Sequence, residues 1–600
     1  MQTKTYLTVA LIASGISCSS LADENLAPII ITATRTAQSV DATLAAVSVI
    51  DRETISRSQA RNLHELFAGL PGVQLTNSGG YGKVSGIHLR GTNSSHVVVL
   101  IDGVRIGSAT TGGTSLGHLP LASIERIEIV RGPASSLYGA DAIGGVIQIF
   151  TRRAQGQPEL HAGIGSGSHN TRRANVGFSA AQGQTNYALD ASRFTTHGFH
   201  SLEGAQTDRN GYQNSAVHAR VDHQFTNDHS LGLSLLHSAG NNHYDNLYDP
   251  RRHTDDTKQQ IISTHWDIAL SEIWQSHLSV SESRDESQNY IDDITGDKFN
   301  TRRKQISWQH DIQLTARLLT TLGAEHQQER IYTTTSYSRE QRKNTAFLAQ
   351  GQLEQGRHNW QLGLRHDDNN TYGRHITGNL AWGYRLSNGM RLSASHGTAY
   401  KAPSFNDLYY PFMGNPDLQA ESSASSELGL QDSFASGHWQ LRAYHTSIKD
   451  LIAWTPDASG YWLPDNVNRA RINGLEFDIG HKQGNWQLGL TLNLTDARDN
   501  KTDKRLIYRA RETARFSVGH QYNRLHSQLD WLISGKRYHD EANSQKIGGY
   551  AVLNTMLRYK LDKNWHIEAR IDNLLDKSYQ EVRDYHTAGR TIFAGINYRQ

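Results

Sequence analysis

The chain has 600 residues, of which 37% are hydrophobic and 20% charged, and its formal net charge is +2. This charge gives no argument for a nucleic-acid partner or for a strongly anionic one. The mean hydropathy is −0.58, and no internal segment has the roughly 20 apolar residues that a spanning helix needs. That test does not exclude a membrane barrel, because its strands alternate lipid-facing and lumen-facing residues and keep average hydropathy low.

A secretory signal peptide is predicted over residues 1–22. Lys4 precedes an apolar run over residues 6–16, and Ser20-Leu21-Ala22 resembles a small-residue cleavage site. Cys18, the single cysteine, lies inside this segment. The residues before it fit a lipoprotein anchor poorly, although that alternative stays open. Cleavage would leave a mature chain that relies on neither disulfides nor thiolate chemistry.

The next segment, residues 23–37, contains the stretch PIIITATR at 28–35. It mixes apolar residues with threonine and has no evident partner strand nearby. This pattern indicates an extended segment able to pair with the sheet edge of another protein. An ordinary first strand of the domain that follows is the alternative.

Residues 38–152 are predicted to form a small, tightly turned domain. The spacing of Leu63, Leu66 and Phe67 predicts a helix over residues 62–68, whose apolar face belongs to the core. Asn62 and Glu65 form a capping pair at its start, and a glycine- and proline-rich stretch ends it. Further along, the dipeptide Asp102-Gly103 between two apolar runs predicts a hairpin.

Four motifs of this domain share one property: each apolar run ends or turns at a glycine, which adopts positive φ at little cost. They are LPGV (70–73), IHLRG (87–91), VVVLIDGVRI (97–106) and IERIEIVRGPASSLYGADAIGGVIQI (124–149). In this order they resemble the plug domain of TonB-dependent outer-membrane transporters. The stretch from Gly82 to Arg105, followed by GADAIGGV, is similar to the cobalamin receptors of that family.

From residue 155 to 600 the pattern changes to segments of alternating polarity, among them WQLRAY (439–444), WQLGLTLNL (486–494) and AVLNTMLRYKL (551–561). At roughly 20 residues per strand and connection, this length gives about twenty-two strands. We therefore expect an all-β membrane protein: a large transmembrane β-barrel with an N-terminal globular plug domain in its lumen. Closure also satisfies the backbone hydrogen bonds in lipid.

The polar segments between the strands alternate in length. Residues 191–213 and 241–258 are predicted to be long external loops, whereas Gly356-Arg357-His358-Asn359 and Gly484-Asn485 are predicted to be tight turns. Two further stretches, 398–423 and 570–580, resemble barrel motifs of the same family. The last residues depart from its pattern, since Tyr598 is followed by Arg599 and Gln600 where such barrels usually end on an aromatic residue.

The resemblance implies a function: active transport of cobalamin, or a related corrinoid, across the outer membrane of a Gram-negative bacterium into the periplasm. Its implied partners are TonB, the transported cobalamin and outer-membrane lipid, with no nucleic acid. The residues that TonB would grip form the TonB box, namely Pro28, Ile29, Ile30, Ile31, Thr32 and Ala33. A siderophore or haem receptor on the same fold is the alternative, and a passive channel or adhesin would belong to another class.

Calcium is the cofactor that the resemblance implies. Residues matching calcium ligands of the cobalamin receptors, or offering an oxygen beside them, are Gln206, Asp208, Asn210, Tyr244, Asp245 and Asp256. Hard cations take six to eight oxygen ligands, which such loops supply together. His200 and Asn210 stand where the family has aspartates, which implies weaker binding and one occupied site. A plain acidic loop remains the alternative.

The substrate site is expected on the outward face of the plug. The resemblance implies contacts from Val84, Ser85, Gly86, Asn93, Thr111 and Gly112, with Asn246 and Arg509 added from the barrel loops. Short polar groups and exposed backbone suit a large, nearly neutral, amide-fringed ligand. Gly86 replaces a serine of the family, and turn geometry alone is the other explanation for the two glycines.

No enzyme is expected, because the sequence has no nucleophile motif, zinc-type histidine spacing or phosphate-binding glycine loop. The 30 histidines are scattered singly. The stretch between Pro403 and Asn415, where haem receptors of this family typically carry a histidine, has none. Solvated or lumen-facing histidines explain this distribution better than a haem site.

Overall fold

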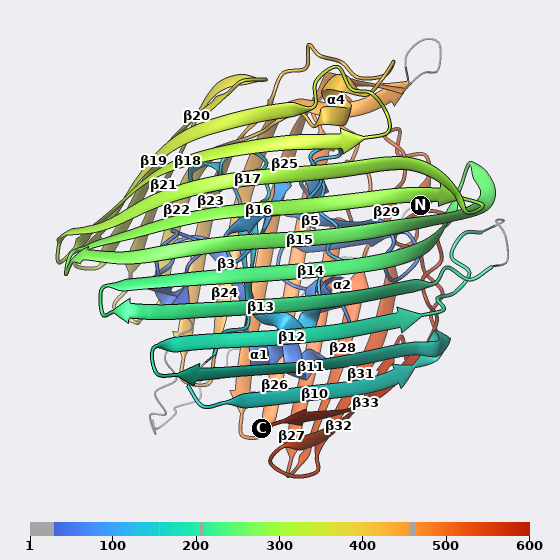
Figure 1. The fold of residues 1–600 in the computed structure, drawn as a ribbon, viewed down its shortest axis with the longest axis horizontal. Helices are drawn as coiled ribbons and strands as arrows, with labels where there is room; N and C mark the ends of the chain where they lie inside the picture. Colours follow the sequence, from blue (N-terminus) through green and yellow to red (C-terminus); the bar gives the residue numbers. More distant parts are fainter. Residues whose placement is uncertain (1–28, 155, 204–207, 457–461) are drawn as a thin grey trace, which may run out of the picture.

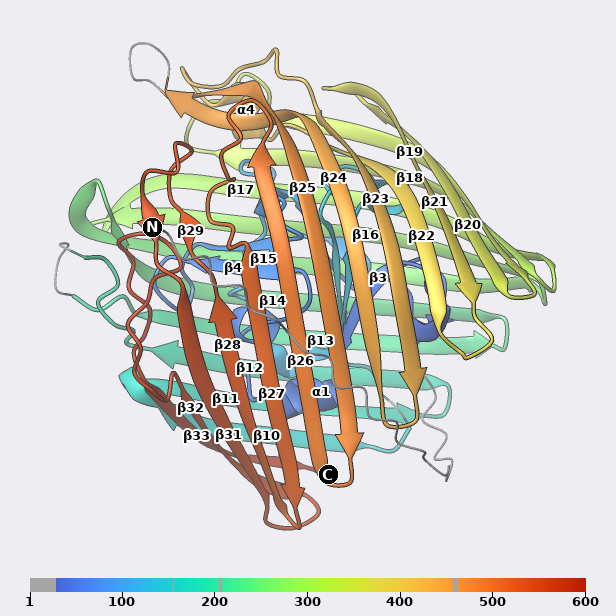
Figure 2. The ribbon, with the colours of Figure 1, turned by 180° about the vertical axis from the view of Figure 1, so that it is seen from behind.

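The computed structural model describes residues 29–154, 156–203, 208–456 and 462–600. The predicted signal peptide, Pro28 and Gln206 lie outside the described residues. A ring of long strands encloses a smaller domain, drawn in blue, that is built from the N-terminal quarter of the chain (Figures 1 and 2). Among the described residues, no helix is long and apolar enough to cross a membrane.

The outer body is a closed barrel, and its strand count confirms the predicted fold class. Each strand pairs antiparallel with the next, and the last pairs with the first. In order around the ring the strands are β10 (Glu159–Gly167), β11 (Thr171–Gln182), β12 (Thr185–Thr196), β13 (Tyr212–Thr226), β14 (His229–Asn246), β15 (Asp249–Ser271), β16 (Trp274–Ile291), β17 (Ile294–Thr315), β18 (Leu318–Thr333), β19 (Gln341–Gln355), β20 (His358–Asn369), β21 (Gly373–Arg385), β22 (Arg391–Lys401), β23 (Glu421–Phe434), β24 (Gly437–Pro456), β25 (Trp462–Gln483), β26 (Trp486–Asp499), β27 (Glu512–Tyr522), β28 (Leu525–Ser534), β31 (Tyr550–Lys560), β32 (Trp565–Asp572) and β33 (Thr591–Arg599).

Strand β26 shows why these segments form a membrane barrel. Leu492 and Leu494 are exposed on its outer face, whereas Thr491, Asn493 and Thr495 are buried on the face toward the lumen. Successive side chains of a strand point to opposite faces, so the same strand contacts lipid with its apolar residues and the polar lumen with the residues between them. The predicted alternation is confirmed here.

The two ends of the barrel differ in their connections. One end has two-residue turns such as Gly484-Asn485, as predicted. The predicted turn at 356–359 is shorter than expected, because β20 begins at His358 and only Gly356 and Arg357 connect the strands. The other end carries the longer loops, including residues 197–211 and 402–420. Long loops of such barrels lie outside the cell and short turns lie in the periplasm. We therefore call these the outer and periplasmic ends.

The predicted long loop at 241–258 is wrong. Strand β14 continues to Asn246 and β15 begins at Asp249, so only Leu247 and Tyr248 connect them. The predicted loop at 191–213 is also shorter, because β12 runs to Thr196 and β13 begins at Tyr212. Polar sequence cannot distinguish a loop from a hairpin that extends beyond the lipid, where outward-facing residues no longer need to be apolar.

The inner domain, the plug, is built around a five-stranded sheet. The strand order is β3 (Ala46–Ile50), β8 (Ile124–Arg131), β9 (Gly145–Thr151), β6 (Val97–Ile101) and β7 (Val104–Arg105). A second pair joins β4 (Val73–Asn77) to β5 (Ser85–Leu89), a third joins β1 (Ile29–Ile30) to β2 (Gln38–Ser39), and an outer-end pair joins β29 (Arg537–Tyr538) to β30 (Lys546–Ile547). The helices are α1 (Arg52–Ser58), α2 (Leu63–Phe67), α3 (Ser135–Tyr138) and α4 (Phe405–Tyr409), with 3-10 turns η1 (Val40–Ala42), η2 (Ser94–His96), η3 (Leu121–Ser123) and η4 (Ser168–Asn170).

The predicted helix and hairpin of the plug are both confirmed. Asn62 caps α2 by accepting a hydrogen bond from the Glu65 amide at 2.8 Å. Asp102 and Gly103 join β6 to β7 with positive φ at both positions, as a tight hairpin requires. The core gathers Leu63 and Phe67 of α2 against the sheet, and both are fully buried. Burying each such side chain stabilises the plug by about 1.5–3 kcal/mol.

Charged side chains join the plug to the barrel wall. Arg90 of the plug contacts Glu427 of β23 at 2.6 Å and Glu476 of β25 at 2.9 Å. Arg131 approaches the second carboxylate oxygen of Glu476 at 3.3 Å. These side chains are all at most 9% exposed. A buried ion cluster of this kind adds little net stability over apolar packing, but losing one member is costly because it leaves an uncompensated charge.

We expect Glu476→Gln to lower the free energy of unfolding of the plug by about 3–5 kcal/mol, because two buried guanidiniums lose their shared carboxylate. Hydrogen exchange of β8 peptides across a urea series measures this, since the plug can unfold while the barrel stays closed. Glu512→Gln is the matched control, because its side chain is 55% exposed. Equal urea midpoints for the two variants would contradict the assignment.

Candidate functional site

The predicted apex residues lie on separate turns of the plug that face the outer end. Val84, Ser85 and Gly86 share the tip of the β4–β5 hairpin, where Ser85 pairs with Asn77. Val84 is 82% exposed, which is unusual for an apolar side chain and leaves it available to a ligand. Thr111 is also exposed, on the loop that follows β7.

Glycine is favoured at the two apex positions for different structural reasons. Gly112 has φ +72°, a conformation that favours glycine, so turn geometry alone accounts for it. Gly86 has ordinary backbone geometry, but a Cβ there would lie 2.6 Å from the Thr76 hydroxyl oxygen. Close packing against β4 therefore accounts for Gly86, and a serine at this position would displace its neighbour.

Two predicted contacts, Asn93 and Arg509, are brought together by the structure. Arg509 lies on the outer loop before β27 and is 5% exposed. Its guanidinium donates to the Asn93 side-chain oxygen at 2.5 Å, to the Thr92 carbonyl at 3.0 Å and to the Gly91 carbonyl at 3.2 Å. The cation thus holds the plug loop to the barrel. The last predicted residue, Asn246, lies at the tip of the β14–β15 hairpin, where its side-chain oxygen accepts from the Tyr248 amide at 2.9 Å.

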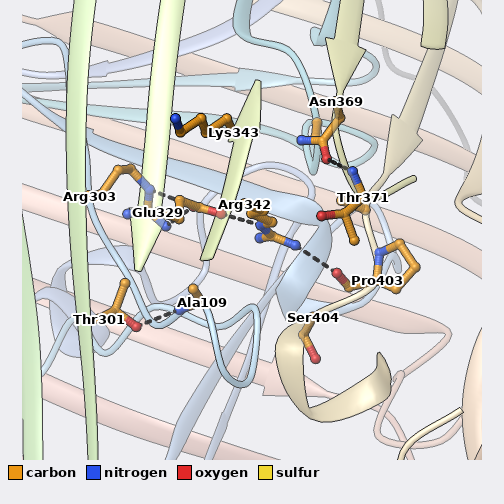
Figure 3. A network of polar contacts seen from close by, with 12 residues as sticks. Ala109, Thr301, Arg303, Glu329, Arg342, Lys343, Asn369, Thr371, Pro403 and Ser404 are labelled. Atoms are coloured by element: carbon orange, nitrogen blue, oxygen red, sulfur yellow. Dashed lines mark hydrogen bonds and ion pairs between the residues drawn. The ribbon is translucent and has the colours of Figure 1, made fainter. Parts of the chain in front are cut away.

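A polar network that the sequence analysis missed positions the Thr111 loop (Figure 3). Glu329 accepts a hydrogen bond from Arg303 at 2.7 Å and pairs with Arg342, which donates to the Pro403 carbonyl at 2.8 Å. Thr301 accepts from the Ala109 amide at 2.9 Å. The sequence did contain one indication of this network, namely charged residues at the lumen-facing positions of β17, β18 and β19. Alternation alone does not say which of them meet.

The predicted calcium ligands are only partly gathered. Asp245 accepts hydrogen bonds from Asn210 at 2.5 Å and Ser201 at 3.1 Å. One carboxylate oxygen of Asp208 is buried without a hydrogen-bond partner among the described residues. Tyr244 contacts the His253 ring, with centroids 5.4 Å apart.

Asp256 lies apart from this group. Its carboxylate accepts a hydrogen bond from Asn241 at 2.8 Å. Side chains alternate along β15, so Asp256 lies on the face opposite to the buried, lumen-facing Gln259. In the described ranges, no three or more His, Cys, Asp or Glu side chains form an arrangement that could hold a metal.

A lysine lies directly beneath these loops. Lys83 donates to the Asn242 side-chain oxygen at 2.6 Å and to the Asn210 carbonyl at 3.2 Å. Burial lowers the pKa of Lys83 to about 7, although Asp245 acts in the opposite direction. Its charge therefore changes near neutral pH, next to the plug hairpin that carries the predicted apex.

The predicted TonB box is folded against its own chain. The expectation of no partner strand nearby is wrong, because Ile29 and Ile30 pair with Ser39 and Gln38. One oxygen of the buried Glu128 accepts hydrogen bonds from the Ile31 amide at 2.9 Å, the Thr32 amide at 2.8 Å and the Thr32 hydroxyl at 2.6 Å. The segment must leave these partners before it can pair with another protein.

Comparisons with known proteins agree with this architecture. The family described as "TonB dependent receptor-like, beta-barrel" matches residues 160–574, and the one described as "TonB-dependent Receptor Plug Domain" matches residues 39–146. The vitamin B12 transporter BtuB of Photobacterium profundum is 32% identical over 577 residues, covering 95% of each chain. The vitamin B12 transporter BtuB of Vibrio vulnificus is 31% identical over 588 residues, again covering 95% of each.

Solved structures share the fold at lower identity. The siderophore receptor PirA from Acinetobacter baumannii superimposes with a TM-score of 0.80 at 18% identity, covering 92% of this chain and 98% of that one. The FrpB iron transporter from Neisseria meningitidis reaches a TM-score of 0.81 at 14% identity, covering 93% and 100%. Plug and barrel are both matched, so the chain belongs to the TonB-dependent receptor family, whose members are transporters of the Gram-negative outer membrane.

Proposed function

We propose that the protein takes up cobalamin or a related corrinoid and releases it into the periplasm with energy delivered through TonB. The uncharged plug apex carries this proposal: Val84, Ser85, Gly86, Thr111 and Gly112 offer hydrogen bonds and an apolar contact without charge. Arg509, the one cation in the predicted set, is already engaged by plug carbonyls. Relatives named as vitamin B12 transporters support the same cargo.

A siderophore or haem receptor is the competing function. Many ferric siderophores are anionic, and their receptors gain from cationic side chains at the binding face. A haem receptor needs an axial ligand, usually histidine. The predicted apex contains neither, and the solved siderophore receptors are similar enough to establish the fold alone.

Calcium is proposed as the ion that orders the outer loops. The residues present fit a hard cation in one respect: a buried carboxylate oxygen of Asp208 has no hydrogen-bond partner in the described part of the chain. Asp208 and Asp245 would hold the ion, with further oxygens from their loops. When bound, calcium would supply charge neutralisation between the two carboxylates, and Asn210 already donates a hydrogen bond to Asp245.

Energy coupling is proposed to act through the TonB box, residues 28–33. Its release from Glu128 and from β2 would expose backbone donors and acceptors that suit β-strand addition by TonB. Thr32 and Ala33 are at most 6% exposed before release. These two residues of the proposed box are therefore buried before release.

Gly112→Trp should weaken cobalamin binding at least about tenfold, equivalent to about 1.4 kcal/mol, because the indole occupies the apex. Isothermal titration of purified protein measures this. Gly183→Trp is the matched control, since Gly183 also has positive φ but lies in a periplasmic turn with open space around it. Tight binding of haem or a ferric siderophore by the wild type, with cobalamin ignored at micromolar concentration, would overturn the substrate assignment.

Asp245→Ala should abolish the calcium dependence of cobalamin binding, because Asp208 alone cannot hold the ion between the two loops. The measurement compares cobalamin affinity in chelator and in millimolar calcium. Asp228→Ala, in a periplasmic turn, is the control that should keep the dependence. If the wild type binds cobalamin equally well in both conditions, the calcium proposal fails.

Ile31→Pro should stop cobalamin uptake while external binding survives, because proline removes a donor that strand pairing needs. The same change also removes the hydrogen bond from Ile31 to Glu128. Glu128→Gln separates the two effects, since it weakens the storage of the box but leaves its sequence intact. Uptake is measured as cobalamin-dependent growth. Normal growth of Ile31→Pro, or an equal loss in Glu128→Gln, would contradict TonB pairing here.

A further inference from the structure

Two cavities lie between the plug and one side of the barrel wall. The outer cavity, of about 410 Å³, is lined at its outer end by Gly80, Phe199 and Asn210, and further inside by Leu66 and Leu532. The inner cavity, of about 520 Å³, reaches the periplasmic ends of the strands at Arg524, Lys560 and Arg599. Both have lining residues on β27, β28, β31 and β32. These strands lie side by side in the barrel wall (Figure 2).

The two cavities share a boundary. Four residues line both of them: Arg57, Arg61, Asn62 and Tyr81. Arg61 belongs to the plug turn before α2, and it spans the boundary to Asp572 of β32 with a nitrogen to oxygen distance of 2.8 Å. We call the space between the plug and this part of the wall the seam. On either side of the shared residues, the seam is wide enough to form a cavity. Arg61 and its partners therefore form the constriction.

The constriction is an ion cluster and not an apolar contact. Arg61 also pairs with Glu65 at 2.9 Å, and Tyr81 donates to Glu65 at 2.7 Å. On the barrel side Arg570 donates to Asp572 at 2.5 Å. Burial raises the pKa of Glu65, but the opposing effect of Arg61 and Arg570 is larger and lowers it to about 2, so the cluster is ionised. Separated charges recover their hydration once water enters, which allows such a contact to open and re-form.

A third cavity between plug and barrel is the competing path. It has about 230 Å³ and is lined by Ile31, Thr32 and Arg35 of the segment that carries the TonB box. The outer cavity is larger, and it begins beside the hairpin whose tip carries Val84. Its lining is rich in side-chain amides, which can replace the water around a neutral, amide-fringed cargo. These amides are Asn62, Gln74, Asn77, Asn210, Gln487, Gln528, Asn554 and Asn573.

We propose that the cargo passes along this seam between plug and barrel, and that the Arg61–Asp572 pair is its gate. The inference rests on the proposed function only in requiring a transported solute. The gate consists of Arg61 on the plug turn and Asp572 on β32. Its opening can be measured without cargo, as ion conductance.

Blocking the seam tests the path. Gln528 is a half-buried, lumen-facing residue of β28 in the outer cavity, and Gln327 is its counterpart on β18 in the competing cavity. We expect Gln528→Trp to slow cobalamin uptake about tenfold or more with external binding unchanged, and Gln327→Trp to transport normally. Normal uptake by Gln528→Trp, or a block by Gln327→Trp alone, would overturn the path.

Opening the gate tests the constriction without any cargo. Arg61→Ala and Asp572→Asn should each raise the ion conductance of the purified protein in planar bilayers. Arg303→Ala is the matched control, because Arg303 is a buried arginine that contacts plug carbonyls but lines neither cavity of the seam. Wild-type conductance in both gate variants, or the same increase in the control, would overturn the gate. A wrong cargo would leave this result unchanged and show only in cobalamin binding.

Discussion

Closure of the barrel is the constraint on which the rest of the structure depends. Strand β33 pairs with β10, so the ring has no free edge and its backbone groups are satisfied within lipid. A ring of this circumference has a wide lumen, and side chains from the wall cannot fill it. The chain fills it with a folded domain of its own, and transport then requires that this domain be both firmly placed and movable.

The lumen-facing side of the wall explains how both requirements are met. Because outward positions are apolar, inward positions are free to be charged. Ion pairs therefore hold the plug in addition to apolar contacts, such as those of Leu236 and Ile261 with the plug core. Arg90 with Glu427 and Glu476, and Arg61 with Asp572, are examples on different sides of the plug. Such contacts are specific in geometry, yet their energy falls steeply when water reaches them. A buried contact of this kind is stable at rest and can be opened by hydration.

The outer face combines sites that the chain keeps apart in sequence. The plug hairpin carrying Val84 begins next to Lys83, which donates to Asn242 and to the Asn210 carbonyl. The loops expected to hold calcium therefore rest on the same hairpin that is expected to touch the cargo. If calcium binds as proposed, ordering the loops would also fix Lys83 and the strand that follows it.

Local and periodic features were determined by the sequence: the helix at Leu63–Phe67, the Asp102-Gly103 hairpin and a barrel of about twenty-two strands. Each depends on neighbours in the chain or on a period of two, which a single sequence displays. The motifs of residues 70–149 also identified the family. Tertiary structure alone decided that Arg509 binds the plug loop at Asn93, that Asp256 lies apart from Asp245, and that Glu128 binds Thr32 of the predicted TonB box. These contacts join residues far apart in the chain, and their partners follow from strand register and from how the plug is seated, neither of which leaves a local pattern in the sequence.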